Sequence, residues 1–297
     1  MFANKVNDNQ SEIMIKKAIL VFLLVLFTGS LNAETKTYKM VFVPASEKGD
    51  ESDYKSLISI TEKLTGFKID TIKVTDYNAA VEAMRAGRAH IAWYGGKTYV
   101  KAAEIAQAEA FAAGVRPGEK DAGYYTYFVV KKDSNIKTFK DVKGKILSLN
   151  SIGSTSGDLI PQVELSKIDL SIKNKDHFKN VFYAGSHDAC LLAVLNNQSD
   201  VCGMSSRNFE ARLEDGTIKL SDVRIIHKSD RVPPPPLAFS KLIPKEDRIK
   251  IKEAVLDAHN HGEIAGYGGK MSHYMEVKDS DYNVLREVIE LLKKNKS

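Results

Sequence analysis

Residues 147–161 read Leu-Ser-Leu-Asn-Ser-Ile-Gly-Ser-Thr-Ser-Gly-Asp-Leu-Ile-Pro. The apolar start of this stretch is typical of a buried strand, its glycines and serines predict a tight turn, and apolar residues from Leu159 onward recur at helical spacing. A strand that leads directly into a helix favours an α/β fold. We expect the helix to begin at or just after Ser154-Thr155-Ser156, with Pro161 in its first turn, where a missing N–H costs least.

The turn between this strand and this helix has the chemistry of an anion site. The first N–H groups of a helix have no partner within the helix, and the helix dipole adds positive charge beside them. Three hydroxyl side chains, Ser154, Thr155 and Ser156, stand next to these groups, so we expect a tetrahedral oxyanion to bind there. The simpler alternative is that one hydroxyl caps the helix and the others only fill the turn. A nucleotide-binding P-loop is disfavoured because no Lys precedes the Ser or Thr that would end the loop.

The first 33 residues have the order of a secretory signal peptide. Lys16 and Lys17 precede an apolar run from Ala18 to Phe27, and small residues follow up to Ala33. The run has half the length of the ~20 residues that span a bilayer, which argues against a membrane anchor. We therefore predict that residues 1–33 comprise an upstream extension and a signal peptide cleaved after Ala33. The remaining chain is expected in the periplasm, with no membrane-spanning segment.

Charge and cysteine content exclude some classes of partner. The 297-residue chain has a net charge of +5, with basic and acidic residues interleaved. A nucleic-acid-binding protein would cluster its Lys and Arg, so we expect no nucleic-acid partner, whereas a small anionic ligand is compatible with this charge. Cys190 and Cys202 have no His or Cys at zinc-site spacing. Whether they form a disulfide in an oxidising compartment stays open, because the geometry between a helix and the following strand decides it.

Strands and helices alternate twice along the chain, and this alternation predicts two lobes. Each lobe is expected to be a mainly parallel sheet flanked by helices, with the ligand in the cleft beyond the carboxyl ends of the strands. The expected boundaries are residues 34–122 plus 232–297 for lobe 1 and residues 123–231 for lobe 2. The strand expected at 123–131 and the proline-rich segment 231–236 are the predicted crossings between them.

A second polar motif falls on the same rim as the hydroxyl cluster. Residues 183–189 read Tyr-Ala-Gly-Ser-His-Asp-Ala, where a strand is expected to end and a helix to begin. His187 can donate to an oxyanion through a ring nitrogen, and Asp188 could orient it. The alternative is that Ser186 and Asp188 cap the helix and His187 is a partly exposed loop residue. A Ser/His/Asp hydrolase is disfavoured because the chain has no Gly-x-Ser-x-Gly elbow, so we expect no enzyme activity.

Three stretches carry a resemblance to a known family: Ala92-Trp93-Tyr94-Gly95, then Ser154-Thr155-Ser156-Gly157 with Pro161, then Ala184-Gly185-Ser186-His187-Asp188-Ala189. In order and spacing they resemble the phosphonate-, phosphite- and phosphate-binding periplasmic proteins of ABC transporters, and the likeness covers essentially the whole exported chain. The resemblance implies a two-lobed fold of the type II periplasmic binding proteins that closes on its ligand by hinge motion, with a membrane permease as partner. It also implies which residues bind the ligand. Ser154, Thr155, Ser156 and His187 would hold the phosphonate oxygens, Tyr94 would close from the other lobe, and Tyr54 and Tyr77 are further aromatic candidates.

Departures from the family pattern bear on the ligand. The resemblance implies that members which bind an aminophosphonate carry one acidic residue after the strand expected at 200–204 and another in the second crossing. Segments 203–208 and 233–236 contain no carboxylate here, so a cationic amine would lack a counter-charge. Arg207 instead offers a fork of donors for a second anionic group or a more highly charged oxyanion, unless it is a solvent-facing loop residue. We expect phosphate, phosphite, a simple phosphonate or an analogue, bound without metal or organic cofactor.

Two other functions stay open at this point, because a fold does not by itself decide a function. The chain could be a periplasmic oxyanion-sensing protein that partners a membrane receptor or histidine kinase, with Cys190 and Cys202 as possible thiol contacts for a soft ligand. It could also be an exported esterase or phosphatase.

Overall fold

The structure is a computed structural model that describes residues 35–46 and 50–294. The predicted signal peptide lies outside these residues. From Lys36 onward the chain groups into one compact unit. Within the part of the chain that is described, none of the helices has the length and apolar character needed to cross a bilayer.

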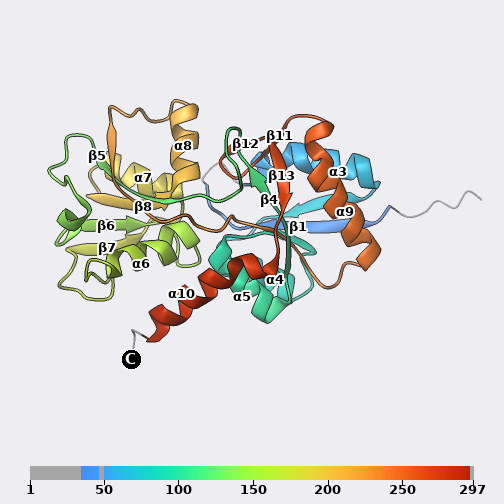
Figure 1. The fold of residues 1–297 in the computed structure, drawn as a ribbon, viewed down its shortest axis with the longest axis horizontal. Coiled ribbons are helices and arrows are strands. Elements are labelled where there is room, and N and C mark those ends of the chain that lie inside the picture. Colours follow the sequence, from blue (N-terminus) through green and yellow to red (C-terminus); the bar gives the residue numbers. More distant parts are fainter. Residues whose placement is uncertain (1–34, 47–49, 295–297) are drawn as a thin grey trace, which may run out of the picture. The chain divides into compact units, whose positions relative to one another are not determined.

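A six-stranded sheet forms the first lobe, with strand order β13-β4-β10-β3-β1-β2 (Figure 1). Its strands are β1 (Thr37–Phe42), β2 (Lys68–Ile72), β3 (Ile91–Trp93), β4 (Glu109–Val115), β10 (Leu237–Phe239) and β13 (His273–Glu276). Strands β1, β2 and β3 are parallel to one another, whereas β10 and β13 run antiparallel to their neighbours. The sheet is therefore mixed, because the chain that returns from the second lobe enters it between β3 and β4.

A five-stranded sheet forms the second lobe, with strand order β7-β6-β8-β5-β9. Its strands are β5 (Thr126–Lys131), β6 (Ile146–Leu149), β7 (Asn180–Tyr183), β8 (Val201–Ser205) and β9 (Val223–Lys228). Here β6, β7 and β8 are parallel, and β5 pairs antiparallel with both β8 and β9. Each lobe thus combines parallel strands, as predicted, with antiparallel strands; β5, β9 and β10 flank the crossings between lobes, whereas β13 does not.

Helices cover both sheets, with α3 and α9 beside the first sheet and α6, α7 and α8 around the second (Figure 1). The helices are α2 (Asp50–Asp53), α3 (Lys55–Thr65), α4 (Tyr77–Arg85), α5 (Gly96–Ala106), α6 (Ile160–Ser166), α7 (His187–Leu195), α8 (Ser206–Glu214), α9 (Lys245–Asp257) and α10 (Asn283–Lys294). Short helical turns occur at η1 (Phe139–Val142), η2 (Thr155–Leu159), η3 (Ala258–Asn260) and η4 (Asp279–Tyr282), and β11 (Ile264–Gly266) pairs with β12 (Gly269–Met271).

Local sequence signals explain several element ends. Asp76 caps α4, because its carboxylate accepts hydrogen bonds from the backbone N–H groups of Asn78 and Ala79 at 2.8 and 2.9 Å. Gly66 ends α3 with a φ of 73°, in the left-handed region that glycine adopts without strain. The sequence patterns did not predict β4, β10, β13 or α8. Strand β4 is rich in small residues without alternation, and β10 follows directly on the proline run.

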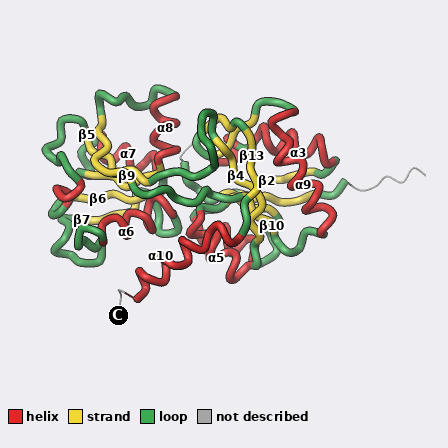
Figure 2. The backbone as a smooth tube through the Cα atoms, in the orientation of Figure 1, coloured by secondary structure: helices red, strands yellow, loops and turns green. Residues whose placement is uncertain are grey.

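Two loop segments cross between the sheets, from β4 to β5 and from β9 to β10, as the loops in Figure 2 show. The crossings pair with each other: the backbone N–H of Val232 donates to the carbonyl of Tyr124 at 2.8 Å, and the reverse bond measures 3.2 Å. The joint between the lobes is therefore a short antiparallel contact rather than two independent linkers.

Candidate ligand-binding site

The hydroxyl-rich turn begins directly after β6 and leads into α6. Ser154 is the N-cap, because its Oγ accepts a hydrogen bond from the N–H of Gly157 at 3.0 Å. The first turn, η2, is wide, of the π type, and Pro161 lies in the first turn of α6, as predicted. The capping alternative therefore holds for Ser154 only, and Thr155 and Ser156 are left with other partners.

Ser154, Thr155, Ser156 and His187 line one small cavity, although the second lobe supplies them from two separate turns. The other lining residues are Ala45, Tyr77, Trp93, Gly95, Tyr124, Pro235 and Tyr267. The cavity measures about 10 Å³, close to the space that one ordered water requires, so in this conformation it has no room for an extended organic molecule. The chain segments of both lobes contribute to its wall.

His187 is buried at the start of α7 and is held by the end of β8. Its Nδ1 accepts a hydrogen bond from the backbone N–H of Ser205 at 3.2 Å. Burial lowers the pKa of His187 to about 3, so the ring is neutral near pH 7 and carries its proton on Nε2. The alternative of a partly exposed loop histidine is therefore wrong, and the ring is a neutral donor in the cavity wall.

Asp188 does not orient His187, contrary to the hypothesis from the sequence. Its carboxylate Oδ1 lies 3.3 Å from the Nε of Arg212 in α8, and the backbone of Ser205 takes the orienting role instead. Asp188 is also absent from the residues that line the cavity. The side chain next to His187 on a helix points in another direction, because successive helical residues are about 100° apart.

A disulfide joins Cys190 and Cys202, with their Cα atoms 5.6 Å apart. The sequence left this pairing open. The bond connects α7 to β8, the two elements that carry His187 and Ser205. Both cysteines are fully buried, so the idea that free thiols contact a soft ligand is wrong.

The three predicted tyrosines have different positions. Tyr77 lines the cavity, and its hydroxyl accepts a hydrogen bond from Asn150 Nδ2 at 3.2 Å. Tyr94 points away from the cavity: its hydroxyl donates to the carbonyl of Ala80 in α4 at 3.3 Å. Trp93 lines the cavity in its place, because adjacent residues of an extended chain face opposite sides.

Tyr54 lies behind the cavity wall rather than in it. Its ring centroid is 5.8 Å from that of Trp93, and its hydroxyl accepts a hydrogen bond from the backbone N–H of Tyr267 at 3.3 Å. Tyr54 therefore supports two residues that do line the cavity, Trp93 and Tyr267.

Tyr124 and Tyr267 were missed by the sequence interpretation. Burial raises the pKa of Tyr124, and hydrogen bonds with the side chains of Ser156 and Thr155 act in the opposite direction. Tyr124 belongs to the aromatic run at 123–127, which indicated only a strand. Tyr267 lies among glycines with no periodic pattern, so no local signal could identify it.

Arg207 is buried at the start of α8, so the solvent-facing alternative is wrong. Its Nη2 donates to the carbonyl oxygens of Gly114 in β4 at 3.1 Å and of Ala122, in the loop from β4 to β5, at 2.6 Å. It is not among the residues that line the cavity. The guanidinium instead sits behind Tyr124, with Cζ 6.0 Å from the centre of that ring.

Contacts across the two lobes surround the site. The backbone N–H of Lys97 donates to Thr155 Oγ1 at 2.9 Å, and the ammonium group of Lys97 pairs with the buried carboxylate of Asp158. Thr98 Oγ1 donates to the carbonyl of Gly153 at 2.8 Å. Because Thr155 Oγ1 accepts from Lys97, the hydroxyl proton of Thr155 stays available for another acceptor. Lys97 and Thr98 were not predicted from the sequence.

Residues 40–282 match the family model of the ABC transporter, phosphonate, periplasmic substrate-binding protein. The chain belongs to this family. As a member, it is 28% identical over 211 residues to the phosphonates-binding periplasmic protein of Escherichia coli, across 69% of this chain and 61% of that protein. It is 26% identical over 280 residues to the phosphate-import protein PhnD of Mycolicibacterium smegmatis, across 86% of each. The match to the first of these relatives thus spans less than two thirds of its length. The names of these relatives describe binding and import of a phosphorus oxyanion.

Solved structures confirm the periplasmic-binding-protein fold of this family member. The binding protein component of an ABC phosphonate transporter from Pseudomonas aeruginosa superposes with a TM-score of 0.76 at 23% identity, covering 88% of this chain and 87% of that one. PhnD1 from Prochlorococcus marinus, solved in complex with methylphosphonate, gives a TM-score of 0.73 at 21% identity, covering 87% and 99%.

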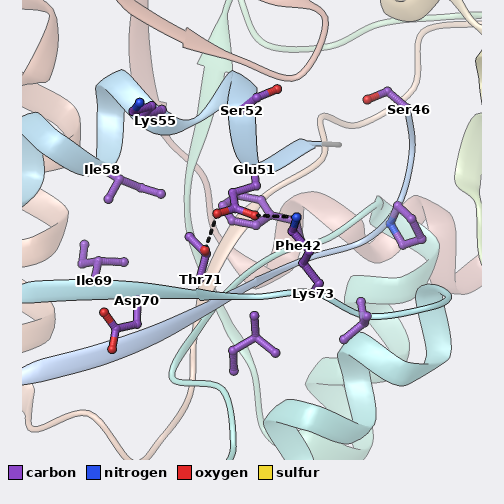
Figure 3. A pocket seen from close by; sticks show the side chains of 13 residues that line it. Phe42, Ser46, Glu51, Ser52, Lys55, Ile58, Ile69, Asp70, Thr71 and Lys73 are labelled. Carbon is purple, nitrogen blue, oxygen red and sulfur yellow. Dashed lines mark hydrogen bonds and ion pairs between the residues drawn. The ribbon is translucent and has the colours of Figure 1, made fainter. Parts of the chain in front are cut away.

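A second, larger groove of about 840 Å³ lies on the first lobe of this protein, between the start of α3 and the edge strand β2 (Figure 3). Three of its polar side chains pair with one another: Thr71 Oγ1 donates to Glu51 Oε1 at 2.5 Å, and Lys73 Nζ lies 3.9 Å from Glu51 Oε2. None of the residues predicted to bind the ligand lines this groove. We therefore assign the candidate site to the small cavity.

Proposed function

We propose that this protein is the periplasmic solute-binding component of an ABC transporter and captures a small phosphorus oxyanion, namely a phosphonate, phosphite or phosphate. The observation that carries the proposal is the convergence of Thr155, Ser156 and His187 on one small cavity at the start of α6. In this proposal, residues 34–122 plus 232–297 form one lobe and residues 123–231 the other. The signal peptide is cleaved after Ala33, and a membrane permease receives the ligand.

Neutral groups hold the anion in this mechanism. All the side chains that line the cavity are uncharged near pH 7, because burial keeps His187 neutral. The hydroxyls of Thr155 and Ser156, the first N–H groups of the helix and Nε2–H of His187 are donors aimed at a desolvated guest. No cofactor takes part. A lining without carboxylates also avoids repulsion of the guest, whereas a cationic amine on the ligand would have no partner there.

The position of His187 argues against an esterase or phosphatase. A general base works best when its pKa is near the operating pH, and burial lowers the pKa of this ring to about 3. Its Nδ1 is already bonded to the backbone of Ser205. A serine beside such a ring would gain little nucleophilicity, so we expect no turnover of a chromogenic phosphate or carboxylate ester.

Isothermal titration calorimetry with phosphate, phosphite, methylphosphonate and aminoethylphosphonate tests the proposed ligand class. We expect tight binding of at least one of the first three and weak binding of the amine. Replacing Ser156 by Ala removes one donor and should weaken binding by about 1–3 kcal/mol. Ser166→Ala removes an exposed hydroxyl from the same helix and should leave binding unchanged.

Two outcomes would contradict this proposal. Tight binding of aminoethylphosphonate alone would show that the site recognises an amine after all. Equal binding by the Ser156→Ala and Ser166→Ala variants would show that the anion lies elsewhere.

A further inference from the structure

Arg207 carries a buried positive charge that forms no ion pair with a carboxylate of residues 35–46 or 50–294. Its side chain is only 3% exposed, and across residues 35–46 and 50–294 it forms no salt bridge. The hydrogen bonds of its guanidinium go to two backbone carbonyls, those of Gly114 and Ala122. A buried charge without a charged partner is unfavourable, so the position of Arg207 calls for a compensating negative charge nearby.

The guanidinium lies one aromatic ring behind the cavity. Tyr124 separates the two: its ring centre is 6.0 Å from Arg207 Cζ, and it lines the cavity together with Thr155 and Ser156. Tyr267, which also lines the cavity, is a further electrostatic neighbour of Arg207. In this water-poor region the field of a fixed charge reaches a guest in the cavity with little screening.

Arg116 lies at the same junction between the lobes and, unlike Arg207, has carboxylate partners. It pairs with Glu210 at 2.8 Å and with Glu214, both on α8, the helix that begins at Arg207's own turn. These two carboxylates are used by Arg116. The pKa of Asp121 is lowered mainly by Arg231, 2.5 Å away, and to a smaller extent by Arg207. Asp121 is therefore paired with Arg231. Among the described residues, the neighbouring arginines thus have carboxylate partners, whereas Arg207 has only backbone carbonyls.

We infer that Arg207 determines the charge selectivity of the site: it is the fixed counter-charge for a doubly negative guest and favours a dianion over a monoanion of the same shape. This inference rests on the proposed function and deepens it. The carbonyls that accept from Arg207 lie in β4 of the first lobe (Gly114) and in the loop that follows it (Ala122). Arg207 itself directly follows β8 of the second lobe. Closure therefore buries the cation, and a dianion in the cavity offsets that burial better than a monoanion.

Three titratable groups that interact with Arg207 have shifted pKa values that keep their charge fixed near neutral pH. Burial raises the pKa of Tyr124 and of Tyr274, and the pairing with Arg231 lowers the pKa of Asp121, so these phenols stay neutral and this carboxylate stays charged. His187 faces the same cavity and stays neutral, since its pKa is about 3. The second ionisation of a phosphorus oxyanion in the cavity is then the main charge change near neutral pH.

Calorimetry with methylphosphonate and methanesulfonate tests this inference, because the two have similar shapes and differ in charge above the second ionisation. We expect the wild type to prefer methylphosphonate at about pH 8. In Arg207→Gln the preference for methylphosphonate over methanesulfonate should fall about 10-fold. This is the interaction expected between the guanidinium charge and the second negative charge of the ligand at roughly 10 Å and an effective dielectric constant near 20. Arg207→Lys keeps the charge and should keep the preference. Arg116→Gln removes a compensated arginine and is the matched control, with the preference retained.

Distinct results separate failure of this inference from failure of the proposed function. If Arg207→Gln binds both ligands more weakly but with the wild-type preference, Arg207 only holds the lobes together and the inference is wrong. If Arg207→Gln does not fold, the lysine variant decides: loss of the preference in a folded Arg207→Lys overturns the inference. If the wild type binds neither methylphosphonate nor phosphate nor phosphite, the proposed function itself is wrong.

Discussion

His187 acts at the residue scale as a neutral donor, and its burial gives this role a consequence for pH. The Nδ1 atom is occupied by Ser205 N–H, so a guest in the cavity meets Nε2–H only. A charged imidazolium would attract an anion more strongly. However, burial disfavours that form, and the donor keeps the same charge across the physiological range.

Paired substitutions of His187 test this donor. Asn can reproduce the acceptor for Ser205 N–H but lacks a donor at the Nε2 position, so His187→Asn should weaken oxyanion binding by about 1–3 kcal/mol. Gln places its amide further out and should retain part of the affinity. Calorimetry on both variants measures the difference. Equal losses in the two variants would argue that the Nε2 donor does not contact the ligand.

The pKa of His187 also predicts an acid sensitivity. The folded pKa of about 3 lies below the ordinary value of about 6.5, so the unfolded state binds the proton more readily. Stability contributed by the neutral ring is present above pH 6.5 and is lost as the pH falls toward 3. The free energy of unfolding measured in urea should therefore fall more steeply with decreasing pH for the wild type than for His187→Asn. Parallel pH profiles for the two would contradict the assignment.

At the scale of the element, the turn η2 needs a glycine at position 157. A Cβ built there would lie 2.3 Å from Cβ of Asn150 and 3.0 Å from Cε1 of His187. The turn approaches the end of the preceding strand, β6, and the start of α7 so closely that only a hydrogen fits. Gly157 is therefore what lets the hydroxyl turn and the histidine turn meet in one cavity.

Replacing Gly157 by Ala should push these two turns apart. We expect a loss of about 1–3 kcal/mol in unfolding free energy from overpacking, and oxyanion binding weakened more than 10-fold. Gly216→Ala is the control: it strains a residue with φ of 74° but meets no atom within 4 Å. It should cost stability without loss of binding, as measured by thermal unfolding and calorimetry. Wild-type binding by Gly157→Ala would show that the close approach does not matter.

At the scale of the whole molecule, the lobes meet through the loop at Gly153. A Cβ on Gly153 would lie 2.3 Å from Cβ of Tyr77 in the other lobe. Tyr77, Lys97 and Thr98 all contact this loop or the turn after it, and α5 contributes two of them. The same loop thus connects the ligand cavity to the arrangement of the lobes.

Gly153→Ala should interfere with closure while leaving each lobe folded, because the clash exists only where the lobes meet. We expect a ligand-free melting temperature near that of the wild type and affinity for methylphosphonate reduced more than 10-fold. Small-angle X-ray scattering should show less ligand-induced compaction than in the wild type. Ile152→Ala, at a 63% exposed position in the same loop, should behave as wild type. Full compaction of Gly153→Ala with ligand would refute the role of this contact.

Local sequence predicted much of the site because its turns are defined by short-range chemistry. The strand, the capped turn and the helix around Ser154 arise from neighbours within one or two turns of chain, as does the start of α7 at Ser186. Parallel strands bring such turns to one rim, so the meeting of Thr155, Ser156 and His187 followed from the order of the elements. Tyr94 was assigned to the wrong side, since the pattern at the end of a three-residue strand does not define which residue faces the ligand.

The sequence by itself determined the α/β alternation, the hydroxyl turn with its cap, and the neighbourhood of the histidine turn. Only the tertiary structure decided that Trp93 replaces Tyr94 in the wall, that Tyr124 and Tyr267 complete the cavity, that Cys190 and Cys202 are bonded, and that Arg207 is buried with its guanidinium on backbone carbonyls. The physical reason is range. Caps and turns depend on adjacent residues, whereas burial, pairing and wall position depend on segments brought together from far along the chain.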